Sequence, residues 1–90
     1  MAASQSEFQS KHTATMAIVD GPDAWIDLGL RYCSGREVGL DLVEAHKWFN
    51  LAAQNGSDAA RRYRAEVASE LTRAEIGEAQ RRAREWMSRH

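Results

Sequence analysis

The sequence predicts an all-α protein of one small domain, built from two consecutive antiparallel helical hairpins in a tetratricopeptide-like, superhelical arrangement. Three observations support this prediction. Apolar and small residues recur at spacings of three and four over most of residues 24–87, as in helices that bury one face. Glycines and helix-capping residues divide this stretch into four segments. No segment shows the strict alternation of a half-buried strand.

Residues 1–19 differ from the rest of the 90-residue chain because they are rich in Ser, Thr, Gln and Ala. Such a composition offers little apolar surface to bury, so we expect a flexible N-terminal segment. Residues 20–90 form the expected helical domain. Within the N-terminal segment, residues 16–19 are the apolar part and are able to cover a neighbouring apolar surface.

The first helix is expected from Pro22 to Ser34. Proline is favoured at the first helical position because its missing N–H would have no helical partner there. Asp20 and Asp23 place negative charge near the positive end of the helix dipole. Gly35 is expected to end this helix in a left-handed conformation.

The second helix is expected to begin after Asp41, whose side chain is a suitable N-cap. Glu44 lies three residues later and is expected to complete a capping box with Asp41. The helix should run to about Asn55, after which Gly56 provides a left-handed stop.

A third helix is expected after an N-cap at Ser57 or Asp58, and a fourth after a capping box formed by Thr72 and Glu75. The apolar stripes are Ala60, Tyr63 and Val67 on the third helix, and Ile76, Ala79, Ala83, Trp86 and Met87 on the fourth.

The first two helices carry a pattern that suits close packing, because two helices approach closely only where their side chains are small. Burial of each large side chain between them stabilises by about 1.5–3 kcal/mol. Ala60 lies 36 positions after Ala24, as though a second unit began there, and repeats of this period are typical of protein-binding proteins. The small residues are Gly29, Ala45, Ala52 and Ala53, and the large ones are Leu28, Tyr32, Trp48 and Phe49.

This pattern resembles the Sel-one-like repeat family, a relative of the tetratricopeptide repeats. One unit is matched, and the chain departs from the pattern at Arg64 and Ala65, so the third and fourth helices are interpreted as a cap. The family loop usually has a second glycine where Glu37 stands, so a different backbone is expected there. The matching residues are Ala24, Leu28, Gly29, Tyr32, Gly35, Val38, Asp41, Ala45, Trp48, Phe49, Ala52, Ala53 and Gly56.

The resemblance implies a non-catalytic adaptor or scaffold that binds another protein, in a short bacterial protein. The first helix carries a second apolar stripe, which a preceding repeat would cover in a longer array. Because exposed apolar stripes are uncommon in monomers, we expect residues 16–19, a second copy in a homodimer, or a foreign protein to cover it. The stripe is Ile26, Leu30 and Cys33, and the predicted protein-binding residues are Trp25, Ile26, Leu30 and Arg31.

Trp25 has two interpretations, an exposed binding anchor or a residue at the edge of the core. Arg31 also has two interpretations. It is either part of a binding surface or the partner of Asp27 in an ordinary helical ion pair, because it lies four residues after Asp27.

The sequence offers no recognisable catalytic, cofactor or metal site, and we expect no enzymatic activity. Cys33 is the one cysteine of the chain and lies in an apolar stripe, which favours an inert thiol. The histidines His12, His46 and His90 share no metal-ligand spacing with it. No stretch has the pattern of a signal peptide or a membrane span, so we expect a cytoplasmic protein.

An alternative from a different class is a nucleic-acid-associated regulator. The net charge of −1 gives no overall attraction to nucleic acid, and acidic residues alternate with the arginines of the last two helices. A solvated face is therefore the favoured interpretation. The arginines concerned are Arg61, Arg62, Arg64, Arg81, Arg82, Arg84 and Arg89.

Overall fold

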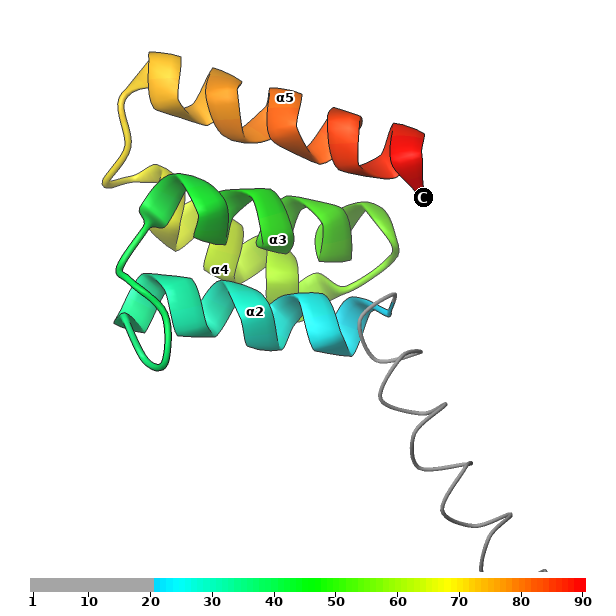
Figure 1. Cartoon of the computed structure of the whole chain (residues 1–90), viewed down its shortest axis with the longest axis horizontal. Helices are drawn as coiled ribbons and strands as arrows, with labels where there is room; N and C mark the ends of the chain where they lie inside the picture. The colour runs from blue at the N-terminus through cyan, green and yellow to red at the C-terminus, as the bar shows by residue number, and fades with distance from the viewer. Residues whose placement is uncertain (1–20) are drawn as a thin grey trace, which may run out of the picture.

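The computed structural model describes residues 21–90, and this part of the chain contains four α-helices and no strand (Figure 1). The all-α prediction is confirmed. The expected flexible segment at residues 1–19, together with Asp20 and His12, lies outside the described residues. No helix within residues 21–90 has the length and apolar character needed to cross a membrane. The helices are α2 (Pro22–Ser34), α3 (Leu42–Gln54), α4 (Asp58–Ala68) and α5 (Arg73–Arg89).

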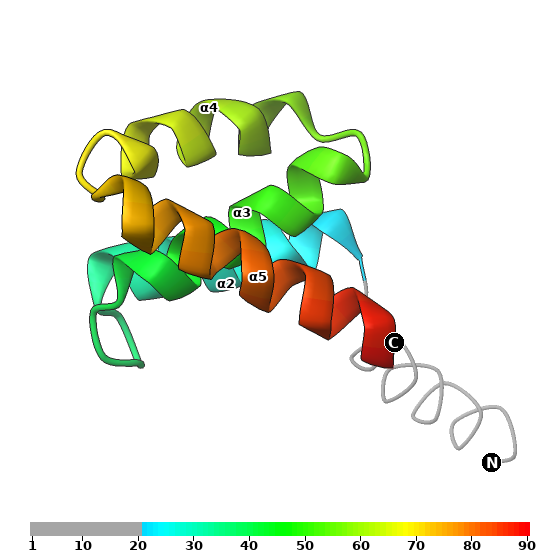
Figure 2. The same cartoon turned by 90° about the horizontal axis from the view of Figure 1, so that it is seen from above.

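Helix α3 is the centre of the fold, because α2, α4 and α5 all pack against it (Figures 1 and 2). Helices α2 and α3 form the antiparallel hairpin that the sequence predicts. The apolar pattern of α3 explains its position, since eight of its thirteen residues are buried. A helix that is buried nearly all round needs neighbours on several sides.

The predicted second hairpin is corrected by the structure. Helices α4 and α5 diverge from their connecting loop, and each packs on α3 instead of on the other (Figure 2). The physical reason is that both helices have narrow apolar faces. Helix α4 buries Ala60 and Val67, and α5 buries Ala79 and Ala83. These small surfaces reach a sufficient core only at α3, where the large side chains lie.

The helix ends follow the local signals of the sequence in most places. Gly35 has a φ of 72° and its N–H donates to the carbonyl of Arg31, while Gly56 has a φ of 98°. Thr72 forms the predicted capping box at the start of α5. Of the two candidate N-caps of α4, the structure uses Ser57, whose hydroxyl accepts a hydrogen bond from the N–H of Ala60 at 3.1 Å.

The start of α3 differs from the prediction in one respect. The Asp41 carboxylate accepts a hydrogen bond from the N–H of Glu44 at 3.0 Å, so the N-cap is confirmed. The side chain of Glu44 does not complete a capping box. It accepts hydrogen bonds from Lys47 and from Arg82, both at 2.8 Å. The contact with Arg82 joins α3 to α5. Because the Glu44 carboxylate binds Arg82, it is not available to complete a capping box at the start of α3.

The hairpin of α2 and α3 depends on a contact between Gly29 and Phe49. A Cβ atom added to Gly29 would lie only 2.6 Å from Cδ1 of Phe49, which is far inside van der Waals contact. Phe49 is completely buried. The ring therefore packs directly on the backbone of α2, and Gly29 is required for space and not for a special backbone angle.

The buried side chains form two clusters, and α3 contributes to both. One contains Trp25, Trp48 and Leu51, with Leu28, Tyr32 and Trp86 at its edge. The other contains Ala45, Phe49 and Val67. Tyr32 packs against both clusters, and Trp48 belongs to the first of them. The two aromatic residues therefore lie in one interior, as the sequence predicts. All small repeat positions that the sequence analysis names in α3, Ala45, Ala52 and Ala53, are buried.

Substitution of Gly29 by Ala is expected to lower the free energy of unfolding by about 1–3 kcal/mol, because the new methyl group enters space that the Phe49 ring occupies. Chemical denaturation followed by far-ultraviolet circular dichroism measures this change.

The matched control is Gly77→Ala in α5, where an added Cβ meets nothing within 4 Å. This substitution is expected to raise stability by about 0.5–1 kcal/mol, because alanine is the better helix former. Equal effects of the two substitutions would contradict the role given to the Gly29 contact.

Candidate functional site

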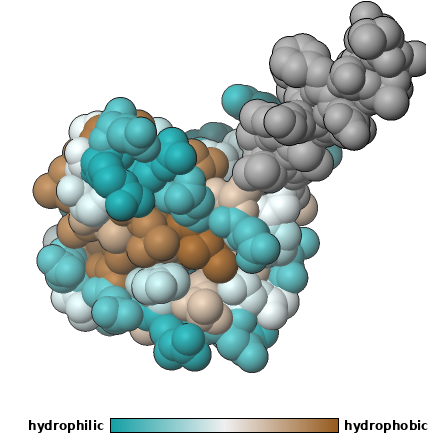
Figure 3. Space-filling view, turned by 90° about the horizontal axis from the view of Figure 1, so that it is seen from below, coloured by the Kyte–Doolittle hydropathy of each residue, from teal (hydrophilic) through white to brown (hydrophobic). Residues whose placement is uncertain are grey.

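A hydrophobic groove lies between α2 and α4, with α3 as its floor. Figure 3 shows the corresponding face as a hollowed hydrophobic strip with hydrophilic residues along its edges. The volume of the hollow is about 270 Å³. We call this feature the α2–α4 groove, and its lining residues are Cys33, Leu40, Leu42, Phe49, Tyr63, Glu66, Val67 and Glu70.

The floor of the α2–α4 groove is fixed by aromatic packing. The rings of Phe49 and Tyr63 are stacked, with centroids 5.2 Å apart and an interplanar angle of 24°. Because Phe49 also packs on Gly29, this stack joins α2, α3 and α4. The floor is therefore part of the rigid core, while the side chains at the edges remain partly accessible.

The loop between α2 and α3 forms one end of the groove. Leu40 lies in this loop and is 67% exposed, so its side chain adds to the apolar surface at this end of the groove. The loop is anchored by a hydrogen bond from the N–H of Asp41 to the carbonyl of Tyr32, at 3.0 Å. Leu40 thus stands at a fixed place beside the hollow.

Glu37 adopts the backbone conformation of a glycine. Its φ is 69°, and it is the one residue other than glycine with a positive φ within residues 21–90. The glutamate adopts this left-handed conformation at a cost of about 1–2 kcal/mol. Its carboxylate lies 3.3 Å from Arg31 Nη1, and this ion pair helps to hold the turn.

The α4 edge of the groove is acidic. Glu66 and Glu70 line the hollow, and no basic residue does. Burial is the main cause that raises the pKa of the Cys33 thiol, and the negative charges of these two glutamates raise it further. Cys33 is accordingly a poorly reactive thiol. The sequence analysis missed Leu40, Glu66 and Glu70, although the spacing of the two glutamates by four residues was a signal for a shared face.

The structure separates the four predicted protein-binding residues. Ile26 and Leu30 are half-buried and pack against the cluster of Phe49 and Val67. The stripe that they form with Cys33 is therefore half covered by α3 and α4, and it is not a bare outer face. Of its three residues, Cys33 lines the groove.

Trp25 is a buried core residue, with an exposed fraction of 4%, so of its two interpretations the structure favours the core residue over the exposed anchor. Its ring packs edge-on against Trp86, with centroids 5.4 Å apart. The sequence did not predict the contact between Trp25 and Trp86, because helical periodicity does not show which residues of two separate helices meet. Arg31 is ion-paired with Asp27 at 2.9 Å, as the local spacing predicts.

A second hollow of about 400 Å³ lies where Trp25 and the C-terminal turn of α5 meet. Trp86 is its central residue, because it contacts Trp25, Trp48 and His90. The His90 ring stacks on Trp86, with centroids 4.1 Å apart. These contacts hold the end of α5 to the core, so we interpret this hollow as a consequence of packing.

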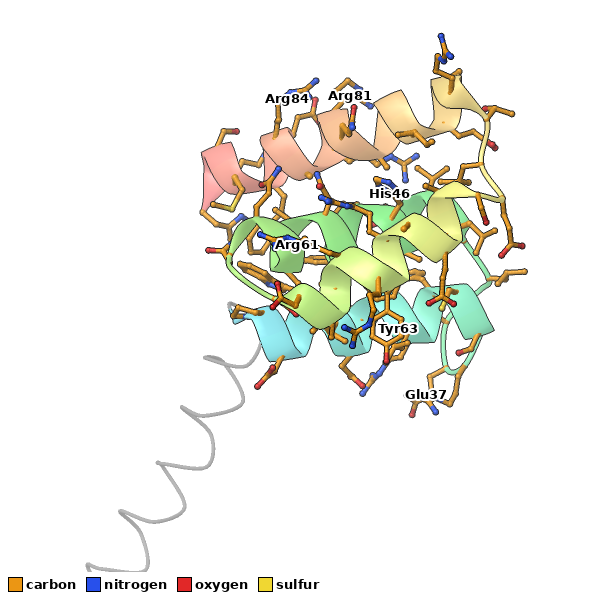
Figure 4. All side chains as sticks on the ribbon, turned by 180° about the vertical axis from the view of Figure 1, so that it is seen from behind. Glu37, His46, Arg61, Tyr63, Arg81 and Arg84 are labelled. Carbon is orange, nitrogen blue, oxygen red and sulfur yellow. The ribbon has the colours of Figure 1, made fainter. Side chains whose placement is uncertain are left out.

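His46 is the buried histidine of α3, with an exposed fraction of 3%. Figure 4 shows it between α4 and α5. Its Nδ1 atom has no hydrogen-bond partner in the structure. Burial, and then the positive charge of Arg64, lower the pKa of His46. No group of three or more His, Cys, Asp or Glu side chains in the described part of the chain is arranged to hold a metal ion.

Most arginines that the nucleic-acid alternative would use are already engaged. Arg81 and Arg82 bind Glu78, and these hydrogen bonds lower the pKa of that carboxyl to about 2. Arg61 is paired with Asp58. Arg64 donates to the side-chain oxygen of Asn50 at 2.6 Å. Figure 4 shows Arg81 and Arg84 on the side of α5 that points away from the other helices, which agrees with a solvated face.

Comparison of the chain with known protein families, with curated proteins and with solved structures found no match.

The buried His46 predicts a loss of stability at mildly acidic pH. The unfolded chain binds a proton at the ordinary histidine pKa of 6.5, whereas the folded chain does so only at lower pH. Protons therefore favour the unfolded state below pH 6.5, and stability declines as the pH falls from that value. We expect an excess loss of up to about 1.4 kcal/mol per pH unit relative to His46→Gln.

Urea denaturation at pH 7.5, 6.5 and 5.5 measures this difference in the free energy of unfolding. Parallel pH profiles of the wild type and His46→Gln would show that His46 is protonated equally well in both states.

Proposed function

We propose that this protein is a non-catalytic binding module that takes an apolar segment of another protein into the α2–α4 groove. The observation that carries this proposal is the hollow itself, with the exposed Leu40 at its end. Water in contact with such a surface is unfavourable, so an apolar occupant gains free energy by displacing it.

The groove is preformed, and this supports a binding role. Phe49 and Tyr63 fix its floor, and the Asp41–Tyr32 hydrogen bond fixes its end. A preformed apolar surface lowers the ordering cost of association. The ionisable groups of the lining are Cys33, Tyr63 and two glutamates, and the raised pKa of Cys33 disfavours a nucleophilic thiolate.

We further propose that α2 and α3 form a single Sel-one-like repeat unit, with α4 and α5 as its cap, in an adaptor or scaffold of the bacterial cytoplasm. The close Gly29 contact and the left-handed Gly35 support this interpretation, because both match the roles that the family pattern implies. The glycine-like φ of Glu37 supports it as well, because the turn keeps a shape that suits the glycine of the family.

The alternative of a nucleic-acid-associated regulator gains little support from the side-chain contacts. Three of its arginines, Arg61, Arg81 and Arg82, are paired with neighbouring carboxylates, which weakens their field on a nearby phosphate. Retention on DNA that falls steeply with salt would favour the alternative, and an absence of retention at low salt would remove it.

The binding function predicts that Leu40→Glu removes captured partners without unfolding the chain. Leu40 is mostly exposed, so the substitution costs little stability, but it places a charge where an apolar occupant would sit. Affinity capture from cells that express the protein, with quantitative mass spectrometry, measures the change. We expect enrichment of specific partners to fall at least about tenfold, which corresponds to about 1.4 kcal/mol.

The matched control is Met87→Glu, a substitution of the other large exposed hydrophobic residue in the described chain, on α5. It should leave capture at the wild-type level. Circular dichroism of all three proteins checks that the fold is kept. Capture that resists Leu40→Glu would place the binding surface elsewhere.

A further inference from the structure

We infer that the occupant of the α2–α4 groove is a peptide segment that carries lysine or arginine next to an aliphatic anchor. This inference rests on the proposed function and adds the chemistry of the partner. It follows from the state of two carboxylates, those of Glu66 and Glu70, which line the hollow beside apolar side chains.

These carboxylates are exceptional within the described chain, where acidic side chains are otherwise engaged. Among residues 21–90, each acidic side chain has an ion pair or caps a helix, apart from Glu66, Glu70 and Asp23. Asp23 lies in the first turn of α2, where the helix dipole stabilises negative charge. Glu66 and Glu70 have no such compensation.

Glu66 and Glu70 lie at the C-terminal end of α4, where negative charge has no local compensation. Glu66 lies in the last turn of α4 and Glu70 just beyond its end, where the dipole favours positive charge, and that turn carries no basic residue. The two glutamates are also four residues apart, a spacing at which like charges repel on a helical surface. A cation bound between them would relieve both effects.

The residues that line the hollow indicate which side chain of the partner lies next to the basic one. Its wall combines Leu40, Val67 and Cys33 with the two carboxylates. A volume of about 270 Å³ suits individual side chains better than a whole ligand of drug size. The matching occupant is thus an aliphatic side chain that enters the hollow, with a flanking lysine or arginine that reaches the α4 edge.

The experiment selects binders from a phage-displayed library of random twelve-residue peptides on the immobilised full-length chain. The best peptide is then synthesised, and its affinity is measured by fluorescence anisotropy. We expect lysine or arginine to be enriched beside leucine, isoleucine or methionine. Glu66→Gln with Glu70→Gln should weaken binding roughly three- to tenfold at low salt, and added salt should reduce this difference.

The charge-matched control is Asp58→Asn with Glu85→Gln, which removes the same amount of charge from exposed sites outside the groove lining. It should bind the peptide like the wild type. An equal loss in both double variants would show a general effect of net charge and would overturn the inference.

The outcomes distinguish this inference from the proposed function. Binding that is lost in Leu40→Glu but kept in the double glutamine variant overturns the basic partner alone. Peptides that resist Leu40→Glu, or a selection that yields no binder, overturn both. Self-association of the wild type that Leu40→Glu abolishes, seen by analytical ultracentrifugation, would assign the groove to a second copy and overturn the basic peptide.

Discussion

The contact between the Phe49 ring and the backbone at Gly29 is the constraint on which the rest of this structure depends. It sets how closely α2 and α3 approach, and the same ring then stacks on Tyr63 of α4. One buried side chain therefore fixes the relation of three helices. A small protein has few core residues to share among its elements, so each large buried side chain has to serve several contacts.

The central position of α3 follows from the same shortage of core. Helices α4 and α5 bury mostly alanine and valine, so neither offers the other enough apolar surface, and both pack on α3. The attachment of α5 is completed by Trp86, which packs edge-on against Trp25 and Trp48, and by the Arg82–Glu44 ion pair at 2.8 Å. The divergence of α4 and α5 is thus a result of where the aromatic side chains lie.

The α2–α4 groove is the surface that this arrangement leaves incompletely covered. Phe49 and Tyr63 fill its floor, while Leu40 stays exposed at its end. Charged side chains likewise differ between the two regions in whether they have a partner within the chain. Arg81 and Arg82 on α5 form ion pairs within the chain, whereas Glu66 and Glu70 beside the groove have no partner among the described residues. This apolar hollow with its unpaired carboxylates is the surface to which we assign the proposed binding function.

The sequence by itself determined the four helices, their limits and most of their caps, because such features depend on residues within a few positions of one another. It also predicted the pairing of α2 with α3, since the small and large residues of that hairpin are complementary. Only the tertiary structure decided that Trp25 is buried, that Glu44 binds Arg82, and that Leu40 stands beside an acidic edge. These outcomes depend on contacts between residues far apart in the chain, and helical periodicity records which face of a helix is apolar but not which neighbour covers it.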